Sequence, residues 1–346
     1  MSVATSGAAS AIHAVDLFCG VGGLTHGLVR SGIAVRGGFD NDESCQYAFE
    51  ANNPDARFME ADICDIGRED IEPFFTDAAA SVLMGCAPCQ PFSAHNRKLR
   101  KEADCSLVYE FARLVEETQP DFVSMENVPG LAKHEAFADF LRVLERLGYH
   151  HDERVVWCPD YGIPQTRRRL VLLASRLGPI GVPQRGGDGG TVRDFIYDLP
   201  SVEAGAAHPD DRTHVTMPLS DLNKRRIQQS RPGGSWHDWD ETLLSACHRD
   251  SLYPAPYGRM SWDTVAPTIT TQFCYYSTGR FGHPEQDRAI SVREGALLQT
   301  FPIDYKFFKE GQPVVVRDAA RQIGNAVPVK LAEAIGESIV EVFCAS

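Results

Sequence analysis

The chain has 346 residues, of which 43% are hydrophobic, and it carries a formal net charge of −13 at pH 7. This length is sufficient for a sizeable core and for two lobes, and the apolar fraction is ordinary for a globular protein. No apolar run approaches the roughly 20 residues of a membrane span. Residues 1–11 lack the basic and apolar regions of a signal peptide, so we expect a disordered lead-in there.

Short apolar strands alternate with helical patterns over residues 12–176. Strands are predicted at Ile12–Phe18, Ala34–Phe39, Arg57–Ala61, Ser81–Met84, Asp121–Met125 and Leu170–Ala174. Helices are predicted at Leu24–Arg30, Glu43–Asn52, Ser106–Glu117 and Ala136–Leu147. Repeated βα units of this kind imply an α/β fold with a doubly wound, mostly parallel sheet.

The pattern changes after Leu177. From Gly178 to about Phe281 the chain is rich in Gly, Pro, Ser, Asp and His, which predicts a loop-dominated lobe with short strands at most. Regular patterns return near Ile290, and Val327–Phe343 is predicted as an amphipathic helix with Pro328 in its first turn. We therefore expect a first domain over 12–182, a smaller loop-rich domain over 183–290, and a return to the first domain over 291–346.

Cysteine usage and local charge limit the classes of function. The ten cysteines show no paired zinc-ligand spacing, so we expect no metal, and the lack of a disulfide framework fits a bacterial cytosol. The acidic balance argues mildly against a nucleic-acid partner, although basic residues cluster locally. The clusters are Arg97–Lys101, Arg167–Arg169, and Lys224–Arg226 with Arg231. Each cluster alone is equally typical of a solvated face.

The segment Gly85–Ser93 follows the apolar run Ser81–Met84. Its Cys89 stands in a turn fixed by prolines at the carboxyl end of the predicted strand, where open α/β sheets place their chemistry. Cys89 is therefore a candidate nucleophile. Two alternatives stay open on this segment alone: a redox pair with Cys86, and a buried structural cysteine.

Three successive strand ends carry residues suited to a nucleoside-bearing ligand. The glycine loop Asp16–Gly23 opens a helix, but Thr25 occupies the third glycine position of a dinucleotide fingerprint, so NAD fits poorly. Asp40 ends the second strand and suits ribose hydroxyls, and Asp62 ends the third and suits an adenine amino group. Singly, each carboxylate is as well explained as a helix N-cap. Their combination predicts S-adenosylmethionine.

With these residues in place, the chain resembles the prokaryotic DNA (cytosine-5)-methyltransferases over nearly its whole length. The matching segments stand in family order: Asp16–Gly23, Pro88–Gln90, Glu126–Val128, Gln165–Arg169, Val292–Glu294 with Leu298–Gln299 and Phe301–Pro302, and Gln322–Pro328. The resemblance implies a Rossmann-like methyltransferase fold with a target-recognition domain at 183–290. It also implies a monomer that methylates a flipped-out cytosine in a specific duplex DNA sequence, often beside a cognate restriction endonuclease.

The resemblance also implies roles for individual residues. Cys89 adds to cytosine carbon 6 as a thiolate, and Glu126 protonates nitrogen 3 as a buried acid. Asn127 positions the loop backbone, Arg169 contacts the cytosine O2, and Arg167 braces the catalytic loop, with Gln165 on the same side of the strand by alternation. The implied cofactor contacts are Phe18, Gly20, Val21, Gly22, Gly23, Asp40, Asn41, Asp62, Ile63, Pro88, Leu107, Asn325 and Ala326.

DNA contacts are expected from two regions. Residues 94–103 are basic and are predicted to form a mobile loop that closes on DNA. The predicted DNA-binding residues are Gln90, Ser93, Arg97, Lys98, Arg100, Lys101, Lys224, Arg225, Arg226 and Arg231, with Trp236 and Tyr275 as further candidates for base readout.

The sequence departs from the family pattern near the nucleophile. Ala87 stands where the family often has proline, and Cys86 adds a second thiol, which we expect to be inert core. Cys19 replaces a residue that is usually small. Two alternative functions remain: an RNA (tRNA) methyltransferase, whose Cys-Phe-Thr signature is not found, and a catalytically silent DNA-binding homologue, which predicts loss of Cys89, Glu126 or the cofactor glycines.

Overall fold

The computed structural model describes residues 9–88, 106–245, 248 and 256–346. The chain forms two compact units. The first unit contains the residues up to Trp157, 168–186 and 327–346, and the second contains 158–167 and 187–326. The second unit therefore extends beyond the predicted boundary at 290, because α10 (Val292–Leu298) packs on α7 (Val192–Ile196) and α11 (Val316–Asn325).

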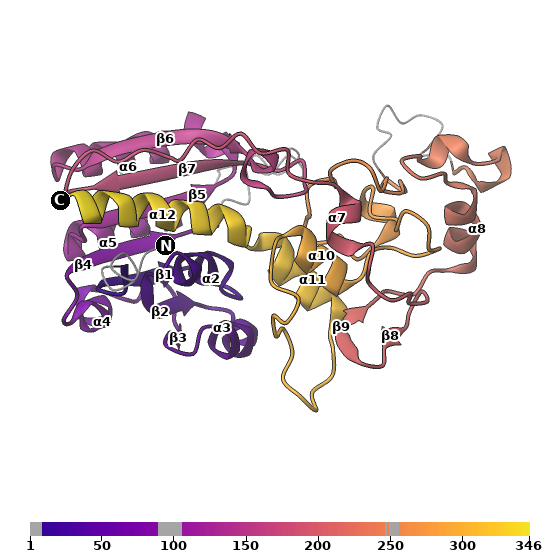
Figure 1. The fold of residues 1–346 in the computed structure, drawn as a ribbon, viewed down its shortest axis with the longest axis horizontal. Helices are drawn as coiled ribbons and strands as arrows, with labels where there is room; N and C mark the ends of the chain where they lie inside the picture. Colours follow the sequence, from indigo (N-terminus) through magenta and orange to yellow (C-terminus); the bar gives the residue numbers. More distant parts are fainter. Residues whose placement is uncertain (1–8, 89–105, 246–247, 249–255) are drawn as a thin grey trace. The chain divides into compact units, whose positions relative to one another are not determined.

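The first unit is built on a seven-stranded sheet (Figure 1). Its strands are β1 (Ile12–Leu17), β2 (Ala34–Asp40), β3 (Arg57–Glu60), β4 (Ala80–Gly85), β5 (Phe122–Asn127), β6 (His150–Trp157) and β7 (Arg168–Ser175). The order is β3-β2-β1-β4-β5-β7-β6, with β7 antiparallel to both neighbours and the other pairs parallel. This confirms the predicted doubly wound, mostly parallel α/β sheet.

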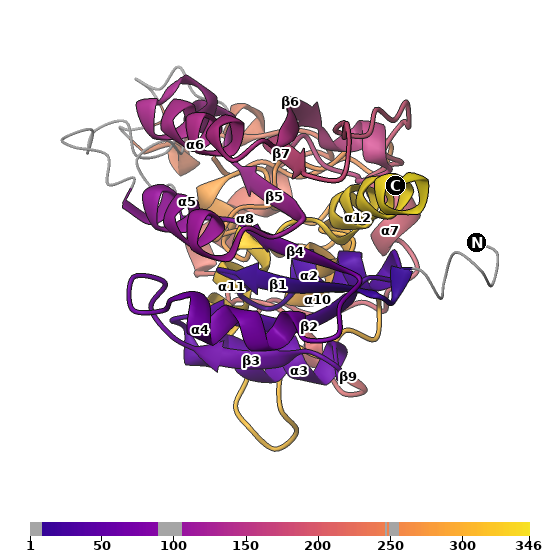
Figure 2. The ribbon, with the colours of Figure 1, turned by 90° about the vertical axis from the view of Figure 1, so that its left-hand side faces the viewer.

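Helices cover both faces of this sheet. They are α2 (Gly23–Arg30), α3 (Gln46–Asn52), α4 (Arg68–Ile71), α5 (Ser106–Thr118), α6 (Glu135–Arg146) and α12 (Val329–Ala345), with short 3-10 turns η1 (Glu43–Cys45), η2 (Glu72–Phe75) and η5 (Pro129–Lys133). Figure 2 shows α4, α5 and α6 on one side of the sheet and α12 on the other. Right-handed crossovers place the helices in this way, because the strand order reverses between β1 and β4.

Apolar packing fixes these helices. The spacing that predicted α5 brings Phe111 against Phe140 of α6, with ring centroids 5.3 Å apart in a T-shaped contact. On the other face α12 packs on α2 so closely that a Cβ on Gly27 would lie 2.3 Å from the Cβ of Ala332. No helix in the described ranges is long and apolar enough to cross a membrane.

The second unit is loop-rich, as predicted. Its elements are η6 (Cys158–Tyr161), α7, β8 (Ala207–His208), β9 (Asp211–Val215), α8 (Asp221–Gln229), η7 (Trp236–Asp238), η8 (Glu241–Leu243), η9 (Tyr276–Thr278), α10 and α11. A small core of Ile227, Trp239, Leu243, Tyr276 and Ala289 supports the α8 region. The recognition role of residues 183–290 stays a prediction.

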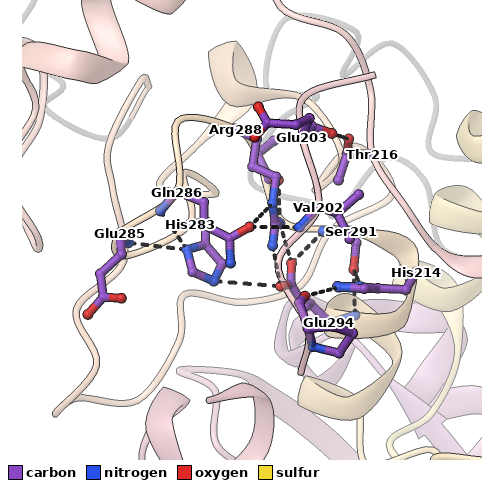
Figure 3. A network of polar contacts seen from close by, with 12 residues as sticks. Val202, Glu203, His214, Thr216, His283, Glu285, Gln286, Arg288, Ser291 and Glu294 are labelled. Carbon is purple, nitrogen blue, oxygen red and sulfur yellow. Dashed lines mark hydrogen bonds and ion pairs between the residues drawn. The ribbon is translucent and has the colours of Figure 1, made fainter. Parts of the chain in front are cut away.

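A buried polar network anchors the start of α10 (Figure 3). Glu294 accepts two hydrogen bonds from Arg288, each at 2.7 Å, and Ser291 completes a capping box with Glu294. Burial by itself raises the pKa of Glu294, but Arg288 outweighs it and lowers the pKa to about 2. Burial also lowers the pKa of His283, whose Nε2 lies 3.6 Å from Glu294, to about 4. The segment Val292–Glu294 therefore contributes to the packing of the second unit.

Candidate active site

The loops that follow β1 and β4 begin side by side. Leu17, the last residue of β1, pairs with Gly85, the last residue of β4, at the point where the strand order reverses. A Cβ on Gly85 would lie 2.7 Å from the Leu17 carbonyl oxygen, so this close approach requires glycine. Open α/β sheets bind ligands at such a switch point.

The loop after β1 has a backbone suited to a ligand. Phe18, Gly20 and Gly22 have φ values of 59°, 49° and 86°, in the left-handed region. A Cβ on Gly20 would meet no atom within 4 Å, so there is open space beside the backbone at this position. Phe18 is half-buried against the apolar core of the first unit, as is Leu107 of α5.

The Asp40 carboxylate lies at the end of β2 and joins this strand to the glycine loop. Its Oδ2 accepts the Gly20 N–H at 2.8 Å, and its Oδ1 accepts the Asp42 N–H at 2.9 Å. Asp62 lies beyond β3 and is exposed, and the Cys64 N–H that donates to its Oδ1 lowers the pKa of this carboxyl group. Both carboxylates therefore lie at the carboxyl edge of the sheet, and their contacts with ribose and adenine stay predictions.

Thr25 has a role that the sequence did not indicate. Its hydroxyl donates to Oδ2 of Asp16 at 2.7 Å, and both side chains are buried. Oδ1 of Asp16 has no hydrogen-bond partner within the described part of the chain. Burial raises the pKa of Asp16 to about 7, although the Thr25 hydroxyl opposes this shift. Thr25, which stands at the position of the third fingerprint glycine, thus hydrogen-bonds Asp16, the residue that begins the glycine loop.

The Glu126 carboxyl group is the centre of the second cluster, at the end of β5. Its side chain is 2% exposed, and Cys86 Sγ donates to its Oε2 at 2.9 Å. Arg169 Nε lies 2.9 Å from Oε1. This ion pair is not aligned as a hydrogen bond, so Oε1 has no hydrogen-bond donor among the residues that the structure describes.

The antiparallel direction of β7 explains why Arg169 reaches Glu126. β7 begins at the edge where β5 ends, and Leu170 pairs with Asn127. An arginine at the amino end of this strand therefore lies beside a glutamate at the carboxyl end of its neighbour. The expectation that Cys86 is inert core is wrong, because its thiol is half-buried and bonded to Glu126.

Asn127 fixes the backbone that leads to the predicted nucleophile. Its Nδ2 donates to the Ala87 carbonyl at 2.9 Å, and its Oδ1 accepts the Val128 N–H at 2.8 Å. These contacts agree with the predicted role of Asn127 in positioning the loop backbone, which stays a prediction. The residues that follow Pro88 lie outside the described residues, and with them the predictions for Cys89, Gln90, Ser93, Arg97, Lys98, Arg100 and Lys101.

Gln165 and Arg167 are not on β7, contrary to the strand alternation that we predicted. The strand begins at Arg168, and both side chains belong to the second unit, where they are buried. Gln165 Nε2 donates to the Leu298 carbonyl at 2.9 Å. Its contacts stabilise the packing of the second unit.

The Arg167 guanidinium joins separate segments of the second unit. It donates to the carbonyl oxygens of Ile269 at 3.0 Å, Gly324 at 3.3 Å and Ala326 at 3.2 Å. Asn325, the exposed last residue of α11, adjoins these carbonyls in the chain. The predicted brace on the catalytic loop and the predicted cofactor contacts of Asn325 and Ala326 stay predictions.

The predicted DNA contacts of the second unit differ in exposure. Lys224 and Arg225 are exposed on α8, and Arg231 is exposed but paired with Asp238 at 2.8 Å. Arg226 is buried, unlike a phosphate contact. It donates to the Leu243 carbonyl at 2.9 Å and stacks on Trp239, 5.0 Å from the ring centroid.

The two remaining candidates for base readout are partly covered. Trp236 is half-buried and stacks on His237 with centroids 3.8 Å apart. Tyr275 is half-buried. Neither the structure nor its contacts assign a base to these rings.

Known proteins resemble this chain over almost its full length. The family described as C-5 cytosine-specific DNA methylase matches residues 12–341. Type II methylase M.HgiDII of Herpetosiphon aurantiacus is 50% identical over 334 residues, which cover 94% of each protein. Type II methyltransferase M.PspPI of Psychrobacter sp. is 30% identical over 354 residues, covering 96% of this chain and 80% of that protein.

A solved structure shares the fold. The structure of a DNA modification methyltransferase encoded within an Escherichia coli prophage matches with a TM-score of 0.73 at 24% identity, covering 96% of this chain and 99% of that one. The match of the family over residues 12–341 and the identity of 50% with a Type II methylase decide the classification. The chain belongs to the C-5 cytosine-specific DNA methylase family.

Proposed function

We propose that the chain methylates one cytosine in a specific duplex DNA sequence, with Cys89 as nucleophile and Glu126 as acid. The observation that carries the proposal is the arrangement around Glu126. A buried carboxyl group with one oxygen lacking a hydrogen-bond donor lies next to the backbone that precedes Cys89 in the chain. This oxygen is paired with the Arg169 cation without an aligned hydrogen bond, and we propose that it meets a ring nitrogen of the base that enters the site.

The residues of the first unit fit S-adenosylmethionine, the cofactor of this reaction. When bound, S-adenosylmethionine supplies a methyl group as an electrophile on its sulfonium. The open space beside Gly20 admits a ligand close to the backbone, and Asp40 and Asp62 present carboxylates at successive strand ends. The residues proposed to hold it are Phe18, Gly20, Val21, Gly22, Gly23, Asp40, Asn41, Asp62, Ile63, Pro88 and Leu107, with Asn325 and Ala326.

The proposed chemistry begins at the base. The Cys89 thiolate forms a bond to carbon 6, and the electron pair of the carbon 5–carbon 6 double bond becomes available at carbon 5. Glu126 protonates or hydrogen-bonds nitrogen 3 through Oε1, which limits the negative charge on the ring. After carbon 5 gains the methyl group, a base takes the carbon 5 proton, the double bond re-forms, and the Cys89–carbon 6 bond breaks with its electron pair returning to sulfur. A proton given to nitrogen 3 goes back to Glu126. Arg169 holds Glu126 and is proposed to contact the cytosine O2.

The proposal of a cognate restriction endonuclease is based on the names of two similar proteins. Two of them are named Type II enzymes, which supports a restriction-modification role with a cognate endonuclease. We place base readout in residues 183–290, with Lys224 and Arg225 as exposed basic residues. The enzyme is proposed to act as a monomer in the bacterial cytosol.

Bisulfite sequencing of DNA from cells that express the chain tests the function and reports the target sequence. We expect protected cytosines at one recurring sequence, and none with Cys89→Ala. Cys344→Ala is a matched control for the loss of an exposed thiol and should keep the same protected sequence. No protected cytosine with soluble wild-type protein would refute the proposal, and methylation of tRNA alone would favour an RNA substrate.

A further inference from the structure

We propose that Cys86 is a positioning residue for the reaction, and that its thiol holds Glu126 through Oε2 so that Oε1 is the oxygen that meets the base. This inference rests on the proposed role of Glu126. It assigns a function to a thiol that the family pattern does not explain and that the sequence suggested to be inert.

The strand register places Cys86 beside Glu126. Gly85, the last residue of β4, pairs with Met125 of β5, and the residues that follow them in the chain are Cys86 and Glu126. The Sγ–Oε2 distance is 2.9 Å. This neighbour relation follows from the backbone pairing of the sheet and does not depend on one flexible side chain alone.

The backbone of Cys86 is held on both sides. Its N–H donates to the Leu17 carbonyl at 3.4 Å, and the carbonyl of the next residue, Ala87, accepts Nδ2 of Asn127 at 2.9 Å. These contacts join Cys86 to the ends of β1 and β5. The thiol is therefore presented to Glu126 from a fixed main chain, which is the condition for a positioning contact.

Because Glu126 is buried, a hydrogen-bond donor to its Oε2 matters for its stability and orientation. The side chain is 2% exposed, and Arg169 of β7 forms an ion pair with its other oxygen, Oε1. A buried carboxyl oxygen without a donor is unfavourable. The Cys86 thiol satisfies Oε2, so the oxygen without a hydrogen-bond donor is Oε1, which lies beside the Arg169 cation.

Replacement of Cys86 has different consequences for alanine and serine. Alanine has no donor, so Oε2 of Glu126 loses its hydrogen bond and the carboxyl group is no longer held in one orientation. A serine hydroxyl can donate to Oε2 from the same backbone position, so it should keep that orientation. A residue that only fills space would not be rescued by a hydroxyl donor.

The test measures the single-turnover rate of methyl transfer between pH 5.5 and 9 for Cys86→Ala and Cys86→Ser. We expect the alanine variant to be about three- to tenfold slower at neutral pH, with KM for DNA and for S-adenosylmethionine within about twofold. The serine variant should keep a rate within about twofold of wild type. Cys344→Ala, which removes an exposed thiol of α12, is the matched control and should match wild type.

A double-variant cycle with Glu126→Ala separates this inference from the proposed function. If Cys86 acts through Glu126, adding Cys86→Ala to Glu126→Ala causes no further loss of rate. An additive loss, an alanine variant with the wild-type rate, or a serine variant as slow as the alanine variant would overturn the inference. A Glu126→Ala enzyme with wild-type activity would instead overturn the proposed role of Glu126. Thermal unfolding of each variant identifies any loss that comes from stability.

Discussion

Replacement of Glu294 by glutamine is expected to destabilise the second unit strongly. Glu294 accepts two hydrogen bonds from Arg288 at 2.7 Å, and both side chains are 1% exposed. Glutamine keeps the size of the side chain but removes its charge, so the Arg288 cation stays buried without its counterion. Removal of one partner of a buried ion pair typically costs about 3–5 kcal/mol.

The lowered pKa of Glu294 indicates how much the Glu294–Arg288 pair stabilises the fold and at which pH this stabilisation is lost. The pKa of Glu294 is lowered in the fold from its ordinary value of 4.5 to about 2, and this difference corresponds to roughly 3 kcal/mol. Because the folded pKa is the lower one, the stabilisation is fully present above about pH 5. It is lost as the pH falls from about 4.5 to about 2, where the wild-type carboxylate also becomes protonated.

Urea unfolding followed by tryptophan fluorescence measures this difference. Three of the four tryptophans, Trp236, Trp239 and Trp262, lie in the second unit, so the signal reports mainly on that unit. The stability difference between wild type and Glu294→Gln should be about 3 kcal/mol at pH 7, about 1 kcal/mol near pH 2.5, and close to zero only below the folded pKa of about 2. Asp263→Asn, which removes the exposed partner of Arg193 in the second unit, should cost less than about 1 kcal/mol. A difference that does not change with pH would refute the reasoning.

Three further predictions concern the packing of the chain and its binding to DNA. Gly27→Val should lower the melting temperature, because its Cβ would lie 2.6 Å from the Val329 carbonyl oxygen, whereas Gly186→Ala, in open space, should not. Arg167→Met should cost about 2–5 kcal/mol in urea unfolding, because it removes the donor to three carbonyls of the second unit; a cost below about 0.5 kcal/mol would contradict this. Arg226→Ala should lower stability, while Lys224→Ala should reduce the salt dependence of DNA binding by filter assay; the reverse pattern would contradict these assignments.

The strands that end at the predicted site were largely predictable from the sequence. The runs that form β1, β4 and β5 are buried at nearly every position, so they are mostly apolar over their whole length, whereas β2 is only partly buried. Because parallel strands end at one edge, Asp40 and Glu126 could be assigned to that edge without coordinates. β6 was missed because it is an edge strand whose residues His150–Arg154 are charged or polar and largely exposed.

Contacts between segments distant in the chain could not be predicted in this way. The partners of Arg167 lie 102 to 159 residues further along the chain, and no local pattern encodes such a pairing. Arg226 is a basic residue like its exposed neighbours Lys224 and Arg225, so the sequence does not distinguish them. Its position on α8, however, directs its side chain into the core. Charge in the sequence identifies basic residues that could contact phosphates. Only their burial shows which of them stabilise the fold instead.

The motif Gln165–Arg169 contains residues that stabilise the fold and a residue with a proposed catalytic role. The chain leaves the second unit after Arg167 and enters the first at Arg168. Arg167 donates hydrogen bonds to backbone carbonyls of the second unit. Arg169, two residues later, pairs with Glu126 in the first unit. Between them Arg168 is exposed and stacks on Trp157, 5.1 Å from the ring centroid. Three consecutive arginines thus have a folding role, a surface position and a proposed catalytic role, because the change of unit falls within the motif.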